Sequence, residues 1–422
     1  MVIFVDSKNS AEFLDSKKSE NMIFLDLHMH SKYSRATSKD LSFEKLVKYA
    51  KIKGIDVLGT GDFTHPEHIK AIKKLKEKNG LYYYGAYPFM ITGEISLMYP
   101  QGGKSRKVHL VLLVPSFEIA EKINSYLDTL GRRDYDGRPI FGISCEKFTE
   151  EMMKISCDIE VIPAHAWTPW FGIFGSKSGF DSLKEAFGEQ IGNIHAIETG
   201  LSSDPAMNWR LSQLDDYAIL SFSDSHSFWP WRMGREATII DVKGNLSYKT
   251  IIDAIRTNAI EGTIEVEPAY GMYHWDGHRN CNFSCSPEET KKLNGICPKC
   301  GDPLTIGVEY RVEELADRPV GFISKNAKKV YKILPLHEII AMFTLTGISA
   351  KKNWEIYNDL IEKFKNELNI LLSVDKKEFL DNRVHEKLVE LIMKNRSGHI
   401  KVKAGYDGTY GEPVLEEQKK LF

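Results

Sequence analysis

Residues that can bind a metal ion follow several short apolar runs in the first half of the sequence. His28 and His30 come directly after "FLDL", and Asp224 and His226 close "AILSFSDSH". Because side chains two positions apart on a strand point to the same face, each pair is placed to hold one ion. Further candidates of the same types lie in or after other apolar runs: Asp62, Glu94, His109 and His165.

These residue types predict a metal-dependent hydrolase. Imidazole and carboxylate ligands suit Zn²⁺ or Mn²⁺, and a carboxylate such as Glu94 can bridge two ions. Two ions about 3.5–4 Å apart bind a phosphate, activate water and stabilise the leaving oxygen, so we expect phosphoester hydrolysis. Deacetylation and deamination use similar sites and have no distinguishing feature here. An isolated histidine at a strand end is usually packed or solvated, so the prediction depends on the whole set.

The apolar runs between residues 22 and 242 alternate with amphipathic stretches such as "SFEKLVKYAKIKG". Runs such as "MIFLDL", "IDVLGT" and "VHLVLLV" predict strands. The alternation predicts an α/β fold with a mainly parallel sheet, closed as a distorted β/α barrel, and a doubly wound open sheet is the alternative. Strand ends converge on one face of a barrel, which would gather the candidate ligands there. His109 is the exception, since it lies near a strand start.

Composition divides the 422 residues into five parts. A polar extension precedes the first strand, and near residue 265 Gly, His, Asn and Cys replace the apolar runs. Apolar stripes at helical spacing follow, and the chain ends in a glycine-rich stretch and a polar tail. The expected parts are an extension (1–20), a catalytic barrel (21–265), a zinc-binding module (266–325), a helical DNA-binding domain (326–405) and a tail (406–422).

Four cysteines within twenty residues predict a structural zinc site. Cys281 and Cys285 form one short pair, and Cys297 and Cys300 form a second pair in "CPKCG". Four thiolates make a closed tetrahedral Zn²⁺ site with no open position for water. His274 and His278 lie just upstream, and we expect them to be solvated loop residues.

The overall charge and hydropathy set limits on partners. The formal net charge is -2, from 56 basic and 58 acidic residues, so any DNA contact must depend on local patches. No apolar run approaches the roughly 20 residues that span a bilayer, and the first residues turn polar too soon for a signal peptide. We expect a cytoplasmic, nucleoid-associated monomer with no membrane partner.

Six motifs, in order, resemble those of the PHP (polymerase and histidinol phosphatase) metal-dependent phosphoesterases: "DLHMHSKYS", "GTGDFTHP", "GEI", "KVHLVLL", "PAH" and "SFSDSH". The resemblance implies two or three catalytic divalent ions, which are Zn²⁺, Mn²⁺ or Mg²⁺. It assigns one ion to His28, His30, Glu94 and Asp224, a second to Glu94, His109 and His165, and a third or adjacent position to Asp62 and His226. Ala36 and Phe63 stand where many members carry ligands, and His65 is the nearest substitute.

Longer segments resemble the endonuclease Q family within this superfamily. They are "VIPAHAWTPWFGIFGSKSGFDS", "ETGLSSDPAMNWRLSQLD" and "SFSDSHSFWPWRMGREAT", followed by "CPKCGDPLTIGVEYRVEELADRP" and "GYDGTYGE". The resemblance implies a DNA repair endonuclease that acts at deaminated bases (uracil, hypoxanthine, xanthine) or abasic sites and cuts 5′ of the lesion. A histidinol-phosphate-like phosphatase and a non-catalytic DNA-binding scaffold are the alternatives.

Several side chains are candidates for DNA contact. The loop after His165 carries aromatic residues that could fill the space of an extruded base, although loop aromatics are more often packed core. "LYYYGAY" is a rival pocket wall, and "GGKSRK" offers Lys104, Arg106 and Lys107 to the phosphates. "QKKLF", Gln418 to Phe422, resembles short peptides that dock on sliding clamps. The expected DNA-binding residues are Trp167, Trp170, Phe171, Lys177, Arg279, Lys351 and Lys352.

Overall fold

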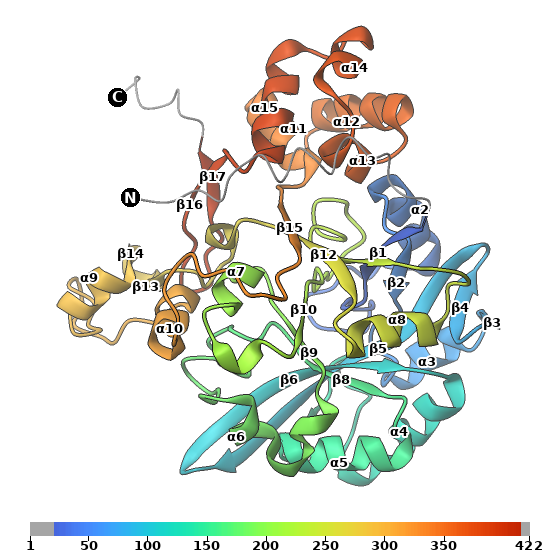
Figure 1. The fold of residues 1–422 in the computed structure, drawn as a ribbon, viewed down its shortest axis with the longest axis vertical. Helices are drawn as coiled ribbons and strands as arrows, with labels where there is room; N and C mark the ends of the chain where they lie inside the picture. The colour runs from blue at the N-terminus through green and yellow to red at the C-terminus, as the bar shows by residue number, and fades with distance from the viewer. Residues whose placement is uncertain (1–20, 415–422) are drawn as a thin grey trace.

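The structure, a computed structural model, describes residues 21–414. A central barrel carries helices on its outer side, the helical region lies at one end, and a small unit with two short strands lies at one side (Figure 1). The extension 1–20 and the peptide Gln418–Phe422 fall outside the described residues. Within residues 21–414, no helix is both long enough and apolar enough to cross a bilayer.

Seven strands close into a distorted ring through main-chain contacts. β1 pairs with β2, β2 with β5, β5 with β6, β6 with β8, and β9 with β10. The Ala166 amide donates to the Glu198 carbonyl between β8 and β9, and a bridge between Met29 and Ser225 joins the segments that follow β1 and β10. The ring strands are β1 (Met22–Asp26), β2 (Val57–Gly59), β5 (Tyr87–Gln101), β6 (Lys104–Val114), β8 (Glu160–Pro163), β9 (Ala196–Glu198) and β10 (Ala218–Leu220).

Each ring strand contributes to one buried apolar cluster, which residues of α8 complete. Its members are almost without solvent contact and include Leu25, Val57, Met90, Val111, Ile162, Ala196 and Leu220. The predicted α/β fold with a distorted β/α barrel is therefore confirmed.

The expectation of a mainly parallel sheet is only partly confirmed: β1–β2, β2–β5 and β9–β10 are parallel, but the sheet as a whole is mixed. β5 and β6 are antiparallel, β6 and β8 are antiparallel, and β1 also pairs antiparallel with β11. β5 and β6 form one long hairpin because Gly102 and Gly103 both adopt positive φ, as a two-residue hairpin turn requires. The other strands of the large sheet are β3 (Lys76–Lys78), β4 (Leu81–Tyr84), β7 (Ile140–Phe141), β11 (Ala237–Asp241), β12 (Ile260–Glu265) and β15 (Lys329–Lys332).

Amphipathic helices cover the outside of the barrel. α2 starts after Ser42, whose side chain accepts a hydrogen bond from the Lys45 amide, and it stops at Gly54 with φ 98°. These helices are α2 (Phe43–Lys53), α3 (Pro66–Ile72), α4 (Phe117–Leu130), α5 (Cys145–Ile155), α6 (Leu183–Phe187), α7 (Pro205–Asn208) and α8 (Tyr248–Arg256), with short 3-10 turns η1 (Gly188–Asn193) and η2 (Ser212–Leu214).

The helical region packs on α2 through a shared apolar core. Leu46 and Ala50 of α2 belong to the same buried cluster as Leu336, Tyr357 and Leu360. The region comprises α11 (Leu336–Thr344), α12 (Lys351–Phe364), α13 (Glu367–Leu372), α14 (Lys376–Asp381) and α15 (Glu386–Arg396). β15, which precedes it, pairs with β12 of the large sheet, so the region is joined to the barrel at its start.

The small unit is tied to the last described residues. The Trp275 amide donates to the Gly405 carbonyl, and the Arg279 amide donates to the Asp407 carboxylate at 2.7 Å. Its elements are η3 (Pro268–Tyr270), β13 (Asp276–His278), η4 (Arg279–Cys281), β14 (Phe283–Cys285), α9 (Pro287–Lys292) and α10 (Val308–Leu315), and β16 (Lys401–Lys403) pairs with β17 (Glu412–Val414) beside it.

Candidate metal centre

Six of the sequence-predicted ligands lie together at one end of the barrel. They form two groups whose ligand atoms lie within 4.8 Å of one another: His28, His30, Glu94 and Asp224, and Glu94, His109 and His165. Glu94 belongs to both groups. Its Oε2 lies 3.3 Å from His30 Nε2, and its Oε1 lies 2.7 Å from His109 Nδ1. The carboxylate therefore stands between two candidate metal positions, as a bridging ligand requires.

The antiparallel hairpin explains the place of His109. Ser96 pairs directly with His109, so alternation puts Glu94 and His109 on the same face of the hairpin. Because β6 runs opposite to β5, its first half lies at the edge where β1 and β2 end. His109 lies in the middle of β6 and not near a strand start as expected, and it thus joins ligands that follow the ends of other strands.

The orientation of His28 fits a metal ligand. Its Nδ1 lies 2.9 Å from Glu198 Oε2, and its Nε2 is buried without a hydrogen-bond partner, 3.6 Å from both Glu94 Oε2 and Asp224 Oδ1. With Nδ1–H donating to Glu198, the lone pair of Nε2 points at two carboxylates. A divalent cation between them would satisfy all three groups, so this donor set fits the metal that the sequence implies.

Asp62 holds His30 rather than joining either group. Its Oδ1 lies 3.0 Å from His30 Nδ1, and its Oδ2 accepts from the Ser31 amide and hydroxyl, each at 2.6 Å. Burial alone would raise the pKa of Asp62, but His30 and Ser31 lower it to about 2. The carboxylate is therefore an anion that fixes the His30 ring with Nε2 toward Glu94.

The residues expected at a third metal position are not gathered into one. His226 Nδ1 lies 3.7 Å from Asp224 Oδ1, but His226 is in neither ligand group. His65, the suggested substitute, accepts the Glu67 amide as the cap of α3 and stacks on Tyr33. Within residues 21–414, the candidate ligands of the barrel therefore define two positions.

Opposite charges balance one another within the centre. Burial would raise the pKa of Glu94, but His109, Arg138 and His28 hold it well below its usual range. Burial would lower the pKa of His28, but Glu198, Glu94 and Asp224 raise it well above its usual value. Without an ion, the carboxylates raise the pKa of His28, His30 and His165, whereas burial lowers the pKa of His109 to about 3. A divalent cation would replace the positive charge on the first three.

Sequence reasoning missed two residues of the centre. Glu198 ends β9, so the rule that selected Glu94 and Asp224 could have found it. Arg138 donates from Nη1 to Glu94 Oε2 at 2.9 Å. It lies in "RRDYDGRP", where its type and spacing gave no signal.

The small unit gathers a Cys/His group that differs from the expected four cysteines. His278 lies with Cys281, Cys297 and Cys300, and its Nδ1 is 3.2 Å from Cys300 Sγ. Cys285 is outside this group, with its Sγ 3.2 Å from Thr290 Oγ1. His278 and Cys281 flank the connection from β13 to β14, whereas Cys285 pairs with Asp276 further along the hairpin. His278 is thus a candidate ligand and not the free loop residue we expected.

The predicted DNA-facing aromatic residues divide into buried and exposed ones. Trp167 is buried and donates from Nε1 to Asn208 Oδ1, so it belongs to the core. Trp170 is 38% exposed and lies 6.0 Å, between ring centroids, from Tyr273 of the small unit. Phe171 is half-buried, with its ring centroid 4.3 Å from that of His109. Phe171 therefore lies against a ligand of the second group, and Trp170 next to it lies against the small unit.

The predicted phosphate-binding cations lie on different parts of the surface. Lys177, Arg279, Lys351 and Lys352 are exposed, and the two lysines begin α12. Arg106 is buried and bonds to Glu185 at 2.7 Å, so it is not available to DNA. Its guanidinium also packs over the Phe180 ring.

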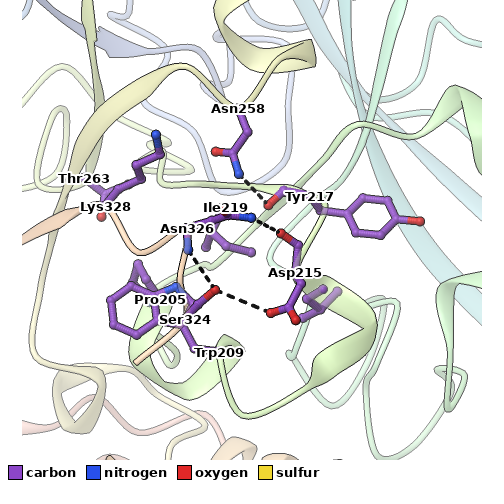
Figure 2. Close-up of a pocket in the computed structure, with 11 residues that line it drawn as sticks. Pro205, Trp209, Asp215, Tyr217, Ile219, Asn258, Thr263, Ser324, Asn326 and Lys328 are labelled. Atoms are coloured by element: carbon purple, nitrogen blue, oxygen red, sulfur yellow. Dashed lines mark hydrogen bonds between the residues drawn. The ribbon is translucent and has the colours of Figure 1, made fainter. Parts of the chain in front are cut away.

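A pocket on the barrel lies away from the metal centre. Figure 2 shows Asn258 and Asn326 donating to the carbonyls of Tyr217 and Asp215 at its wall. Tyr217 directly precedes β10 and Asn258 lies two residues before β12, at the amino ends of these strands. Asp224 follows the carboxyl end of β10, so the pocket opens at the opposite end of the barrel.

Two curated relatives resemble the chain. An uncharacterized protein of Methanocaldococcus jannaschii is 32% identical over 294 residues, which are 69% of this chain and 36% of that protein. The chain thus spans only about a third of that relative. The protein YqxK of Bacillus subtilis is 27% identical over 411 residues, which are 92% of this chain and 98% of YqxK. Residues 335–399, within the helical region, match the family described as the MJ0043 C-terminal domain.

Two solved structures resemble the chain over nearly its whole length. The lesion-specific endonuclease PfuEndoQ from Pyrococcus furiosus has a TM-score of 0.83 and 29% identity, covering 95% of this chain and 97% of PfuEndoQ. An endonuclease Q in complex with a 27-mer duplex that carries an abasic lesion at the active site has a TM-score of 0.85 and 30% identity, covering 94% of this chain and 98% of that chain. Because the second structure is 30% identical to this chain and is covered over 98% of its length, this chain belongs to the endonuclease Q family.

Proposed function

We propose that this protein is a metal-dependent DNA repair endonuclease. It would recognise deaminated bases and abasic sites and hydrolyse the phosphodiester 5′ of the lesion. The observation that carries the proposal is the position of Glu94 between two groups of histidine and carboxylate ligands. The family supports it, since one member was solved on a duplex with an abasic lesion at its active site.

The buried carboxylates orient the ligands. Glu198 holds His28 and Asp62 holds His30, each through Nδ1, so both Nε2 atoms face Glu94. When two divalent ions are bound, they neutralise the phosphate and lower the pKa of water. Zn²⁺ and Mn²⁺ suit the imidazole donors, and Mg²⁺ is a weaker candidate for this set. His226 lies at the edge of the first group, where it can exchange a proton with water.

The Cys/His group has the composition of a structural zinc site. Three thiolates and one imidazole complete a tetrahedral set, which leaves no position for substrate. The ion would fix β13 and β14 relative to the Cys297–Cys300 turn. Because Tyr273 precedes this hairpin and lies next to Trp170, the zinc unit would also support one wall of the DNA approach.

DNA would lie across the face that carries the metal centre. Trp170 and Phe171 are placed to stack on, or replace, a base that leaves the duplex, and Lys177, Arg279, Lys351 and Lys352 are candidates for phosphate contact. The N-terminus of α12 carries no side-chain cap, so amides of its first turn can donate to a phosphate beside the two lysines. We also propose that the protein is a monomer and acts in the cytoplasm, close to chromosomal DNA. It would dock on a sliding clamp through Gln418–Phe422.

A small-molecule phosphatase is the second candidate function. The two ligand groups alone would serve it equally well. It gives no role to the exposed Trp170, to the Cys/His unit or to the helical region. A non-catalytic scaffold gives no role to the unpaired Nε2 of His28.

Nicking of end-labelled DNA tests the proposal. The substrates are duplexes with one uracil, hypoxanthine or abasic site, incubated with Mn²⁺ or Mg²⁺. We expect one nick 5′ of the lesion with the wild-type protein and none with His28→Ala, while the exposed His399→Ala keeps wild-type activity. Release of phosphate from small esters without a nick would support the phosphatase, and lesion binding without turnover would support the scaffold.

A further inference from the structure

Arg138 is held against the metal centre by a tightly fixed segment. The Arg138 amide donates to Asp136 Oδ1 at 3.2 Å, and the next carbonyl, of Pro139, accepts the Ser96 amide of β5. Gly137 leaves no room on the other side, because a Cβ there would lie 2.2 Å from Asp62 Oδ2. The guanidinium is therefore presented from a rigid backbone, two residues before β7, which pairs with β5, and beside the ligands of the first group.

The guanidinium reaches the ligand group from its open side. Nη1 donates to Glu94 Oε2 at 2.9 Å, and the side chain is 27% exposed. Among residues 21–414, its Nε and Nη2 donate no hydrogen bond to another protein group. An arginine has five N–H donors, so most of this fork remains available for a ligand.

Glu94 Oε2 cannot serve Arg138 alone once an ion is bound. That oxygen faces His28 and His30 and belongs to the first candidate metal position. A cation there draws on the same oxygen, which weakens its hold on the guanidinium. Asp224 and Asp136 also lie close enough to act on the charge of Arg138, but its unused N–H donors can take a further anion. A phosphate bound at the ions is the anion that this reaction brings.

We propose that Arg138 binds the scissile phosphate, with its guanidinium on a non-bridging oxygen beside the first metal position. The planar fork matches two phosphate oxygens, and its charge stabilises the additional negative charge of the transition state. This inference rests on the proposed phosphodiesterase function. The competing role is purely structural: Arg138 would neutralise Glu94 and release it to the metal, without touching substrate.

Phosphate binding separates the two roles. The measurement is the dissociation constant of inorganic phosphate for the Mn²⁺-loaded protein, by calorimetry, with bound Mn²⁺ counted on the same samples. For Arg138→Gln we expect about 10- to 100-fold weaker phosphate binding, the effect of losing one charge-assisted contact, at unchanged Mn²⁺ content. Arg132→Gln is the matched control, since Arg132 lies in the same segment but is exposed and paired with Asp134.

Arg138→Lys keeps the inference testable if the glutamine variant loses metal or stability. It retains the charge beside Glu94 but not the fork, so we expect phosphate binding several-fold weaker than in the wild type. A purely structural role would leave the phosphate affinity of both variants at the wild-type value. That result would overturn the inference, whether or not the Mn²⁺ affinity of Arg138→Gln rises.

A small diester distinguishes this inference from the proposed function. Hydrolysis of thymidine 5′-p-nitrophenyl phosphate needs the phosphate site but no lesion. If the wild type cleaves it, with a raised KM in Arg138→Gln, and yet never nicks damaged DNA, the role of Arg138 stands and the repair function fails. If the wild type nicks damaged DNA while Arg138→Gln retains its KM and phosphate affinity, the repair function stands and the role of Arg138 fails.

Discussion

Glu198 Oε2 lies 2.9 Å from Nδ1 of His28, although 170 positions separate the two residues in the chain. Both are fully buried, and the same carboxylate oxygen accepts the His165 amide at 3.1 Å. One carboxylate therefore sets the orientation of a ligand in the first group and the position of the main chain that carries a ligand of the second. A carboxylate behind a metal-bound histidine also raises the basicity of that ligand.

Glu198→Gln should weaken metal binding while preserving the fold. The amide fills the same space but lacks the negative charge that keeps His28 Nδ1 protonated. We expect about 10- to 100-fold lower affinity for the catalytic ion, measured by competition with a chelator, and a parallel loss of nicking at low metal concentration. Excess Mn²⁺ should restore part of the activity. Glu189→Gln, at an exposed glutamate, is the control.

Whether the sequence could predict a residue of this centre depends on whether local alternation or contacts with distant parts of the chain determine its position. Residues that follow buried strands, such as His28 and Asp224, are placed by local alternation, and the pattern found them. Glu198 obeys the same rule, but its partner lies across the barrel, so only the closed ring reveals its role. Arg138 is positioned by a loop whose contacts are all tertiary, and no periodic pattern predicts such a contact.

The barrel itself was predictable for a similar reason, but the antiparallel pairing of β6 with β5 and β8 was not. Apolar runs and amphipathic stretches specify strands and helices, whereas parallel or antiparallel pairing depends on the connection. Gly102 and Gly103 are the local sign of the β5–β6 hairpin, since two adjacent glycines permit the tight turn. The four clustered cysteines predicted a metal site, but which four residues gather as candidate ligands is decided by the β13–β14 register.

Substitutions in the Cys/His unit should show whether His278 or Cys285 is the fourth zinc ligand. If His278 is the fourth ligand, His278→Ala loses the tightly bound zinc, whereas Cys285→Ala retains one zinc per chain, as counted with a colorimetric chelator. Loss of the ion should also lower the thermal stability of the small unit, because a structural zinc site contributes folding free energy. Zinc retained in His278→Ala and lost in Cys285→Ala would restore the four-cysteine site.

His337 should make the folded protein sensitive to acid. It is fully buried between Trp231, Trp354 and Tyr357, neither ring nitrogen has a hydrogen-bond partner, and burial together with Lys53 lowers its pKa to about 3 from about 6.5. The unfolded chain therefore binds this proton first. The stability that depends on a neutral His337 is present above pH 6.5 and falls steadily as the pH drops toward 3.

The variant His337→Phe removes this proton linkage. Between pH 8 and pH 5 the wild type should lose about 2 kcal/mol more unfolding free energy than the variant, measured by urea denaturation at both values. Comparing the two proteins cancels the titration of the metal centre, which they share. His399→Phe, at an exposed histidine, should retain the wild-type pH dependence. Equal pH dependence of wild type and His337→Phe would show that His337 is solvated or paired in the folded state.

A buried ion pair should fasten the helical region to the barrel. Lys53 Nζ, at the end of α2, lies 2.6 Å from Glu367 Oε1 of α13 and 2.7 Å from the Pro230 carbonyl. Glu367 also accepts the Leu336 amide and the Tyr357 hydroxyl. Neither charge has solvent contact, and burial lowers the pKa of Lys53 although Glu367 opposes this shift. The pair thus joins the barrel, the segment after Asp224 and the first three helices of the helical region.

Removing one charge of this pair should therefore lower the free energy of unfolding far more than removing both charges. Lys53→Met leaves a buried carboxylate uncompensated, and we expect a loss of about 3–5 kcal/mol of unfolding free energy. Lys53→Met with Glu367→Gln should recover most of this loss, because the amide keeps a carbonyl for the Leu336 amide without a charge. Lys249→Met breaks the exposed pair with Asp253 and should cost less than about 1 kcal/mol. Urea denaturation gives these values, and hydrogen exchange should locate the effect in residues 336–396 before the barrel. Equal losses in the single and double variants would mean that the helical region is held by its apolar contacts alone.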